Sequence, residues 1–522
     1  LAGHNIYELG EMTLRDLAQL LDDLHIAGDQ PGPQASLRTV RLRLRFLQQV
    51  GLAYLNLHRL SATLSAGEAQ RVKLAGLLGS GLTSLTVLLD EPSRGLHPTE
   101  VEALISALKE LRDGDGESST RNTVIVVEHD PQIISEADDL VDMGPGAGEQ
   151  GGRVVAHGSP AQVARADTLT GAWLRNERHI DLHLPRRTPR AWLEIRGARE
   201  NNLRNITVRL PLGVLAGVCG VSGSGKSTLL IDTLGRVLAP RKITGSVSRE
   251  PLQPGAHEAI TGAPARVVIV DQTRTGIHSP ATNLRLDEPL LRLYAASPDA
   301  HALNLNAEQL GRRCAACNGS GSIRYEMGFL PDVFIACEVC RGTGFVPEAW
   351  QVRLQGLALP EVFGLTIDQV YARFGTDPAL ARPLEAARQA GLGYLVLRQP
   401  GVALSGGESQ RLKIADELAR TARDETLYLL DEPTVGQHLE DVSRLARVLH
   451  GLVDAGHSVW VIEHHMHLLA ACDYLLELGP GGGPEGGQVI AAGTPEQLAG
   501  MRTPSAPYLQ QVLAGESRRH AR

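Results

Sequence analysis

The chain has 522 residues, of which 43% are hydrophobic, and its formal net charge is −8. At roughly 150 residues per domain, this length predicts three or four domains. No apolar run approaches the ~20 residues that span a bilayer, and no signal-peptide pattern opens the chain, so we expect a cytoplasmic protein without membrane segments. The negative net charge argues only weakly against a nucleic-acid partner, because a basic stripe on one face is sufficient.

An internal duplication organises the chain. Four short motifs occur twice in the same order, at offsets of 335 to 341 residues. The first copies are Leu64–Arg71, Val87–Pro92, Val126–His129 and Gly144–Gly148, and the second copies are Leu404–Arg411, Tyr428–Pro433, Val461–His464 and Gly479–Gly483. Because this period is far longer than that of a solenoid repeat, we interpret it as a duplicated domain.

Only the second copy carries a phosphate-binding loop and a cysteine cluster. At the observed offset their counterparts would fall before Leu1, and the first methionine is Met12. We therefore expect the first module to be incomplete in this chain. The Pro- and Arg-rich stretch Leu184–Arg190 is typical of a linker between the copies.

The segments around these motifs alternate between strand and helix patterns. We expect turns at Asn201-Asn202 and Pro211–Gly213 among short strands over residues 191–218. Buried strands are expected at Val267–Val270 and Leu427–Leu430, and helices at Val101–Leu111 and Val442–Leu452. Strands that alternate with helices around a phosphate-binding loop predict a mainly parallel α/β sheet.

The phosphate-binding loop lies between the strand pattern Leu215–Cys219 and the helix start Thr228–Ile231, and reads G-x-x-x-x-G-K-S. Its backbone N–H groups can surround phosphate oxygens, Lys226 can reach the β- and γ-phosphates, and Ser227 can bind Mg²⁺. A Gly-rich turn that binds nothing is the alternative. The predicted ligands of ATP or ADP are Gly220, Ser222, Gly223, Ser224, Gly225, Lys226, Ser227 and Thr228.

A pair of acids follows an apolar run in each copy. Asp431 ends the run Leu427–Leu430, where a carboxylate supports Mg²⁺. Glu432 can then orient the attacking water. Asp90 and Glu91 repeat the pattern in the first copy. Two adjacent acids that merely cap a helix are the alternative.

Four of the six cysteines form two C-x-x-C pairs, Cys314 with Cys317 and Cys337 with Cys340, and 19 residues separate the pairs. This spacing predicts a Zn²⁺ site, and four thiolates leave no open position, so its role would be structural. Each pair precedes a turn of small residues. Free core cysteines or a redox pair are the alternatives.

The segment Leu404-Ser-Gly-Gly-Glu408 resembles the signature motif of ABC ATPases. From about Asn5 to Leu498 the chain resembles the UvrA family, the damage-recognition subunit of the excinuclease. The segments that carry this resemblance are Val221–Thr228, Asp271-Gln272 with Ser279–Thr282, Glu326–Val333 inside the cysteine cluster, and Val124–Asp130.

The resemblance implies an α/β fold with two tandem ABC-type P-loop ATPase modules, the first incomplete, and an inserted tetra-cysteine zinc module. We expect residues 1–180 to form the C-terminal part of the first module and residues 181–192 the linker. The second module would cover 193–305 and 351–505, the zinc module 306–350, and a tail 506–522.

In the ABC family each ATP lies between the P-loop of one copy and the signature motif of the other. The resemblance thus implies that Gln272 is the Q-loop glutamine and His464 the switch histidine. The first site would join Lys226, Ser227, Gln272, Asp431, Glu432 and His464 to Ser65 and Gly67. The second would join Asp90, Glu91 and His129 to Ser405, Gly406, Gly407 and Glu408.

Several residues differ from the usual motif sequences of the family. Ala66 replaces the signature glycine, which would weaken the complete site if the backbone there needs positive φ or approaches a phosphate closely. Arg94 and the stretch Val435–His438 also differ.

As to function, the resemblance implies a dimeric ATPase that recognises damaged or distorted double-stranded DNA in nucleotide excision repair and passes the site to UvrB. Four arginines near the cysteines could contact phosphates, or could simply be solvated: Arg312, Arg313, Arg324 and Arg341. The alternatives are a UvrA paralogue that confers resistance to DNA-binding drugs without engaging UvrB, the ATPase subunit of an ABC transporter, and an ATP-dependent translation factor.

Overall fold

The computed structural model describes residues 1–24, 31–61, 64, 66–78, 84–113, 121–240, 252–271, 278–327, 333–420 and 424–520. The chain divides into two compact units. The first comprises Leu1–Asp142, Val154–Ile269 and Asp424–Arg522, and the second comprises Met143–Arg153 and Val270–Arg423. Both Asp-Glu motifs and the P-loop therefore lie in the first unit, whereas the cysteine cluster and the second signature motif lie in the second unit.

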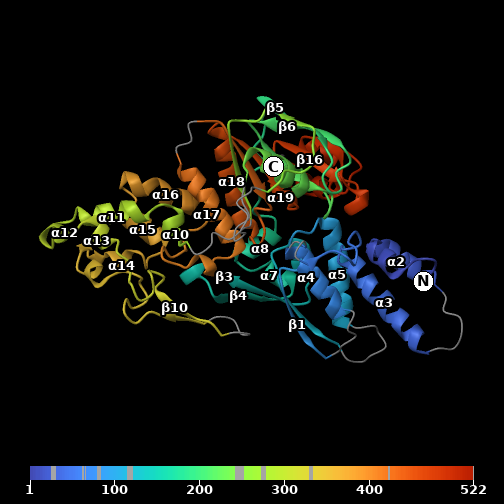
Figure 1. Cartoon of the computed structure of the whole chain (residues 1–522), viewed down its shortest axis with the longest axis horizontal. Coiled ribbons are helices and arrows are strands. Elements are labelled where there is room, and N and C mark those ends of the chain that lie inside the picture. The colour runs from blue at the N-terminus through green and yellow to red at the C-terminus, as the bar shows by residue number, and fades with distance from the viewer. Residues whose placement is uncertain are drawn as a thin grey trace. The chain divides into compact units, whose positions relative to one another are not determined.

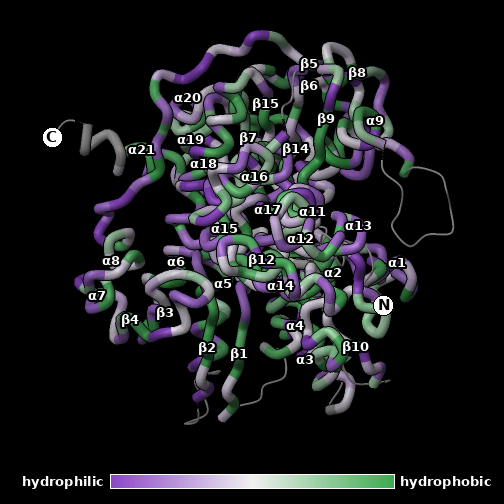
Figure 2. The backbone as a smooth tube through the Cα atoms, turned by 90° about the vertical axis from the view of Figure 1, so that its left-hand side faces the viewer, coloured by the Kyte–Doolittle hydropathy of each residue, from purple (hydrophilic) through white to green (hydrophobic). Residues whose placement is uncertain are grey.

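A six-stranded sheet with the order β17-β16-β7-β15-β14-β9 forms the centre of the second copy. Strand β7 pairs in parallel with β15 and β16, and β15 pairs in parallel with β14, whereas β17 runs antiparallel to β16. Every residue of β7 and β15 is buried, as expected for parallel strands covered on both faces. Figure 2 shows both strands as predominantly hydrophobic. This confirms the predicted mainly parallel α/β sheet.

The strands of this sheet are β7 (Leu215–Cys219), β9 (Arg266–Val270), β14 (Thr426–Asp431), β15 (Ser458–Ile462), β16 (Tyr474–Gly479) and β17 (Gln488–Gly493). The helices of the same copy in the first unit are α9 (Arg236–Leu238), α18 (Leu439–Asp454), α19 (Met466–Ala471), α20 (Pro495–Ala499) and α21 (Ala506–His520). The strands expected at 215–219, 267–270 and 427–430 and the helix expected at 442–452 are thus present.

The helix after the P-loop differs from an ordinary α-helix. Residues Thr228–Gly235 form a π-helix, in which the Thr233 hydroxyl donates to the Thr228 carbonyl at 2.8 Å. The helical geometry becomes regular only at α9. A π-helical turn at this position is a feature that apolar spacing cannot predict, and such turns are frequent at functional sites.

A smaller sheet of β5 (Ala191–Ala198), β6 (Ile206–Leu212) and β8 (Ala259–Thr261) packs beside the central sheet in the same core. The expected turn at Asn201-Asn202 is present, and Asn201 has φ 51°. The turn expected at Pro211–Gly213 is wrong in its first two residues, since Pro211 and Leu212 belong to β6. Pro211 is tolerated because β6 is an edge strand of its sheet, and its carbonyl accepts from Trp460 Nε1 at 2.9 Å.

The first copy repeats the paired strands in shorter form. Strands β1 (Thr86–Asp90) and β2 (Thr123–Val127) pair in parallel in the register Asp90↔Val127, as Asp431↔Ile462 do in the second copy. Helix α5 (Pro98–Asp113) contains the expected helix 101–111. The other elements are α1 (Ile6–Glu11), α2 (Leu14–Asp22), α3 (Pro31–Gln49), α4 (Ala66–Leu78), α6 (Pro131–Ser135), β3 (Leu140–Gly144), β4 (Arg153–Gly158), α7 (Pro160–Val163) and α8 (Leu169–Leu174).

The second unit is mainly helical, with one core that extends from Ala281 to Ala415 and includes Phe345 beside the cysteine cluster. Figure 1 shows helices α11 to α16 gathered together, with strand β10 extending from them. Its elements are α10 (Pro280–Asn283), α11 (Asp287–Ala295), α12 (Pro298–Ala302), α13 (Ala307–Leu310), β10 (Ser322–Tyr325), β11 (Val333–Ala336), β12 (Arg353–Leu354), β13 (Leu357–Ala358), α14 (Leu359–Val362), α15 (Ile367–Phe374), α16 (Pro378–Gln389) and α17 (Gly406–Ala419).

Candidate functional site

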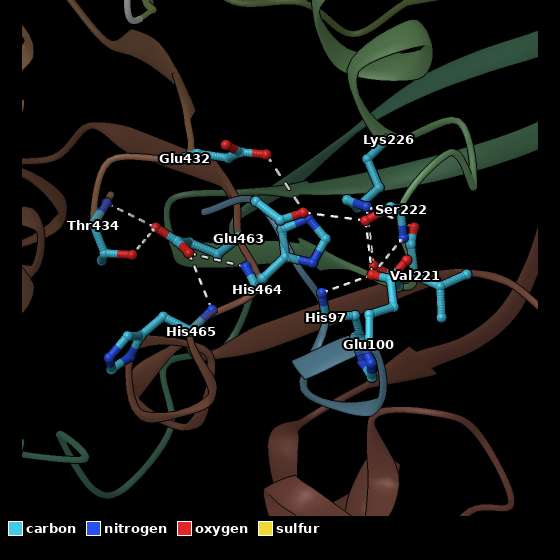
Figure 3. Close-up of polar contacts among 12 residues, drawn as sticks. His97, Glu100, Val221, Ser222, Lys226, Glu432, Thr434, Glu463, His464 and His465 are labelled. Atoms are coloured by element: carbon cyan, nitrogen blue, oxygen red, sulfur yellow. Dashed lines mark hydrogen bonds and ion pairs between the residues drawn. The ribbon is translucent and has the colours of Figure 1, made fainter. Parts of the chain in front are cut away.

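The P-loop Gly220–Ser227 turns from β7 into the π-helix. The Lys226 ammonium donates to the carbonyls of Gly220 and Val221 at 2.9 Å each, so it closes the loop on itself (Figure 3). Lys226 is buried, and burial lowers the pKa of its ammonium. Ser227, by contrast, is exposed and therefore accessible to a cation.

Residues of the first copy lie directly against this loop. A Cβ at Gly223 would lie 3.0 Å from the Tyr54 ring, and the Tyr54 hydroxyl donates to Glu68 of the first signature helix α4. The Ser222 hydroxyl donates to the Gly95 carbonyl at 3.1 Å and to the Glu100 carboxylate at 2.7 Å. The structure thus brings the P-loop of the second copy together with the signature region and the segment after Glu91 of the first copy.

The Asp-Glu pair of the second copy ends β14. The Glu432 amide donates to the Ile462 carbonyl at 2.9 Å, and Glu432 adopts a left-handed φ of 47°. Such a conformation is costly for a non-glycine residue and is concentrated at functional sites. His464 Nε2 lies 3.8 Å from Glu432 Oε1 (Figure 3). Burial holds the pKa of His464 well below its usual value, so its imidazole is neutral at pH 7.

The first copy repeats this arrangement. The Glu91 amide donates to the Val127 carbonyl at 2.9 Å, and Glu91 has φ 44°. His129 Nε2 lies 3.9 Å from Glu91 Oε1, and Asp90 ends β1. Partial burial raises the pKa of Glu91. The two predicted water-orienting glutamates therefore share one backbone geometry.

Each copy has a further glutamate that the sequence reasoning missed. Glu463 accepts from the amides of Thr434, His464 and His465 at 2.9, 2.9 and 3.1 Å and from the Thr434 hydroxyl at 2.6 Å (Figure 3). Glu128 likewise accepts from the Ser93 amide at 2.8 Å and the His129 amide at 2.9 Å. These carboxylates join the segment after each Asp-Glu pair to the switch histidine. The repeated V-x-E-H pattern was the available signal.

A cavity of about 280 Å³ lies between the two Asp-Glu and switch segments. Its walls include Glu91 and His129 from the first copy, and Glu432, His464 and Tyr508 from the second copy. The loop after each Asp-Glu pair lies against the glutamate of the other copy. A Cβ at Gly436 would lie 2.6 Å from Glu91 Oε1, and a Cβ at Gly95 would lie 3.5 Å from Glu432 Oε1. Each glutamate therefore faces the loop that follows its counterpart.

The structure describes some of the predicted signature residues. Gly67 is in α4, where a Cβ would lie 2.9 Å from the Arg94 carbonyl. Ser65 and the predicted Q-loop residue Gln272 lie outside the described residues. Ser405 caps α17 and accepts from the Glu408 amide at 3.1 Å, so Gly406 and Gly407 form the first turn of that helix in the second unit. Lys413 of α17 donates to Asp271 Oδ1 at 2.9 Å, next to Gln272.

The four predicted metal ligands converge. The sulfur atoms of Cys314, Cys317, Cys337 and Cys340 are buried and all lie within 4.8 Å of one another. The Cys314–Cys337 and Cys317–Cys340 sulfur distances are 4.0 and 3.6 Å. Tetrahedral Zn²⁺ with Zn–S bonds of about 2.3 Å requires sulfurs about 3.8 Å apart. The residues therefore fit zinc.

The backbone around the cysteines supports thiolate ligands. Backbone N–H groups lower the pKa of the Cys337 thiol to about 7. Desolvation raises the pKa of Cys340 to about 11, and the Gly344 amide, which donates to Cys340 Sγ at 3.2 Å, offsets part of this rise. Gly344 has φ 78°, and a Cβ there would lie 2.3 Å from the Gly319 carbonyl, so only glycine fits. The two small-residue turns thus pack against each other.

The surface beside the cysteines is both basic and apolar. All four arginines considered for phosphate contact are exposed. Arg313 also pairs with Asp287 at 3.4 Å and stacks over the Phe345 ring. On the hairpin β10–β11, Tyr325 and Phe334 are 50% and 57% exposed. Sequence reasoning missed this apolar hairpin.

Comparison with known proteins places these features in a family context. A protein-family model described as "ABC transporter" matches residues 203–435. The chain is 43% identical over 527 residues to the UvrABC system protein A of Methanothermobacter thermautotrophicus and 42% identical over 528 residues to that of Thermus thermophilus. Each alignment covers 98% of this chain and 54% of the relative, so the chain spans about half the length of these relatives.

A solved structure agrees with the sequence relatives. The crystal structure of UvrA2 from Deinococcus radiodurans matches with a TM-score of 0.87 at 40% identity. The match covers 98% of this chain and 64% of that one. Within the described residues, none of the helices combines the length and the apolar character needed to span a membrane.

Proposed function

Because this chain belongs to the UvrA family, we propose that it is the part of a DNA-damage-recognising ATPase that carries one complete P-loop and the zinc module. The whole protein would bind ATP with Mg²⁺ and survey double-stranded DNA for nucleotide excision repair. The observation that carries this proposal is the contact between the P-loop of the second copy and the first copy, where Ser222 bonds to Gly95 and Glu100.

In the proposed site each residue has a chemical task. Lys226 would leave its own loop carbonyls to bind the β- and γ-phosphates, and Ser227 with Asp431 would hold Mg²⁺. Glu432 would orient the attacking water, and the neutral His464, whose Nε2 lies 3.8 Å from Glu432 Oε1, would lie beside that water. Ser65 and Gly67 would complete the site from the first copy.

A second nucleotide site would combine the Asp-Glu and switch residues of the first copy with the signature motif of the second copy. Asp90, Glu91 and His129 would act together with the signature residues Ser405, Gly406 and Gly407, and with a P-loop outside this chain. The shared geometry of Glu91 and Glu432, with φ 44° and 47°, supports equivalent roles. Gln272 would contact the Mg²⁺ region of the first site.

The cysteine cluster would hold one structural Zn²⁺, and the surface beside it would meet DNA. Arginines next to exposed aromatic side chains, such as Arg324 paired across the hairpin with Phe334, can combine phosphate contact with contact to bases or grooves. A damage sensor must not read sequence, so backbone contact and DNA deformability should dominate. A homodimer that passes its DNA to UvrB completes the proposal.

The experiment is a salt titration of the full-length protein with intact and lesion-bearing duplexes, with and without ATP. We expect log K to fall by roughly 0.9 for each phosphate neutralised. A deformation difference of ~1–3 kcal/mol would favour the lesion by roughly 5- to 150-fold. Salt-insensitive binding, or none, would contradict the DNA proposal and favour a transporter or translation-factor role.

A UvrA paralogue that acts without UvrB is the second candidate. The unusual residues Ala66 and Arg94 favour it. A pull-down with purified UvrB distinguishes the two candidates. Retention of UvrB on lesion-bearing DNA supports the excision role, whereas DNA binding without UvrB retention supports the paralogue.

A further inference from the structure

Glu100 of the first copy touches the phosphate-binding loop of the second copy. Its carboxylate accepts from the Ser222 hydroxyl at 2.7 Å and from the Ser222 amide at 3.3 Å (Figure 3). The same oxygen, Oε2, accepts from the His97 amide at 2.8 Å. One carboxylate thus joins the P-loop to the start of α5. This helix begins after Glu91 and the loop that contains Gly95.

This carboxylate occupies a place that suits an anion. A P-loop presents N–H and hydroxyl donors and a lysine to the phosphates of a nucleotide. In this structure Glu100 takes two of those donors on Ser222, while the Lys226 ammonium bonds to its own loop. Burial lowers the pKa of Lys226, and among the surrounding charged groups Glu100 raises that pKa the most.

A terminal phosphate would therefore meet a carboxylate of the same charge sign. Ser222 is the third residue of the loop, at the end that faces the first copy through Gly95. In the proposed site the γ-phosphate of ATP would extend toward that copy, whereas ADP would end at the β-phosphate, farther from Glu100. Repulsion by Glu100 should therefore act mainly against ATP.

We propose that Glu100 is a specificity-determining residue that senses the γ-phosphate at the P-loop of the other copy. This inference rests on the proposed ATPase function. Before the γ-phosphate enters, Glu100 must release Ser222 and keep only its bond to the His97 amide. His97 is itself held in place, because it is buried and its Nε2 bonds to Ser505 Oγ of the second copy at 2.9 Å, so Glu100 stays anchored when it releases Ser222.

The test compares nucleotide affinities of the full-length protein with those of Glu100→Gln. Glutamine keeps the acceptor that a capping box needs but removes the charge. We expect Glu100→Gln to bind a non-hydrolysable ATP analogue about fivefold more tightly, and ADP with less than about a twofold change. Glu110→Gln, on the same helix but paired with Arg45 and Gln49 instead of the P-loop, is the matched control and should leave both affinities unchanged. Lys226→Ala removes the lysine of this P-loop, so the nucleotide binding that it abolishes is the binding at this site.

The difference between the two nucleotides separates charge repulsion from a merely structural effect. A structural change in the loop should alter the affinities for the ATP analogue and for ADP alike, whereas loss of repulsion against the γ-phosphate should alter only the affinity for the ATP analogue. An equal change for ATP analogue and ADP, or no change, would overturn the proposal. Failure of the unmodified protein to bind either nucleotide would instead contradict the ATPase function itself.

Discussion

The two copies of the Asp-Glu and switch segment have the same local geometry in different surroundings. Glu91 and Glu432 lie 3.9 and 3.8 Å from their switch histidines, and both have left-handed φ. Yet the His464 side chain is 8% exposed and the His129 side chain 37% exposed. The strands differ likewise, since β15 is fully buried and β2 alternates between exposed and half-buried residues.

This difference separates what the local sequence determines from what tertiary structure adds. A strand, an Asp-Glu pair and a Glu-His pair are enough to produce the backbone turn and the Glu–His contact. Burial then decides the electrostatics, because it lowers the pKa of His464 and raises the pKa of Glu463 to about 7.

The zinc module is the largest asymmetry, because the cysteine cluster occurs once in this chain. We expect one Zn²⁺ at this cluster, and we expect Cys317→Ser to lose the metal and unfold the module. Zinc supplies roughly 10–16 kcal/mol of apparent folding free energy to such small modules. Metal analysis and limited proteolysis measure this. Cys472→Ala, at a buried cysteine outside the cluster, should retain the metal. Full metal content in Cys317→Ser would refute the ligand assignment.

Glutamate-to-glutamine exchanges compare the two proposed hydrolytic sites directly. We expect Glu432→Gln to lower turnover at its site by about 10²- to 10⁴-fold while ATP still binds, because only the water-orienting carboxylate is lost. Glu91→Gln should act in the same way at the other site. Single-turnover ATP hydrolysis and nucleotide binding in the full-length protein measure both effects. A double variant that still turns over at the unmodified rate would show that neither glutamate has this role.

The pH dependence of stability should reveal the buried Glu463. Its folded pKa of about 7 exceeds the usual 4.5, so the folded state binds the proton more tightly than the unfolded state. The resulting stabilisation is present in full below pH 4.5 and is lost as pH rises through 7, by on the order of 3 kcal/mol. Thermal unfolding from pH 5 to 8 should show this loss in the unmodified protein but not in Glu463→Gln. The same pH dependence of thermal unfolding in both proteins would contradict a raised pKa of the buried Glu463.

The smallest effect is expected at the first signature motif. Ala66 opens helix α4, where the second copy has Gly406 at the start of α17. We expect Ala66→Gly to raise ATP turnover at the Lys226 site by about twofold, because removal of the Cβ relaxes the approach of the helix N-terminus to a phosphate. Steady-state turnover is the measurement, with Gly406→Ala as the reciprocal exchange. Slower turnover in Ala66→Gly would show that the alanine is favourable.

Much of the fold was predictable because its signals are local. The strand before Lys226, the strand before Asp431 and the helix at 442–452 follow from apolar runs and spacing, and the four cysteines converge as their spacing predicts. The turn prediction at Pro211 was wrong because proline usually ends a strand, whereas here it lies in an edge strand, where proline is tolerated.

The contacts that the sequence reasoning missed are non-local. Glu100 is 122 residues from Ser222 and lies in no motif that the sequence analysis identified. Glu463 looks like an ordinary polar neighbour of His464 until the fold brings the Thr434 amide and hydroxyl to it. Neither residue belongs to a motif whose chemistry is evident from spacing alone.

In the proposed arrangement both copies assemble one nucleotide site around Lys226. The most direct test is the structure of the full-length Glu432→Gln protein with ATP and Mg²⁺. We expect phosphates held by Lys226 and Ser227, Mg²⁺ near Asp431, and the amide of Gly67 from the first copy on the γ-phosphate, with Glu100 released from Ser222. A nucleotide held by the second copy alone, with Gly67 away from the phosphates and Glu100 still on Ser222, would contradict it.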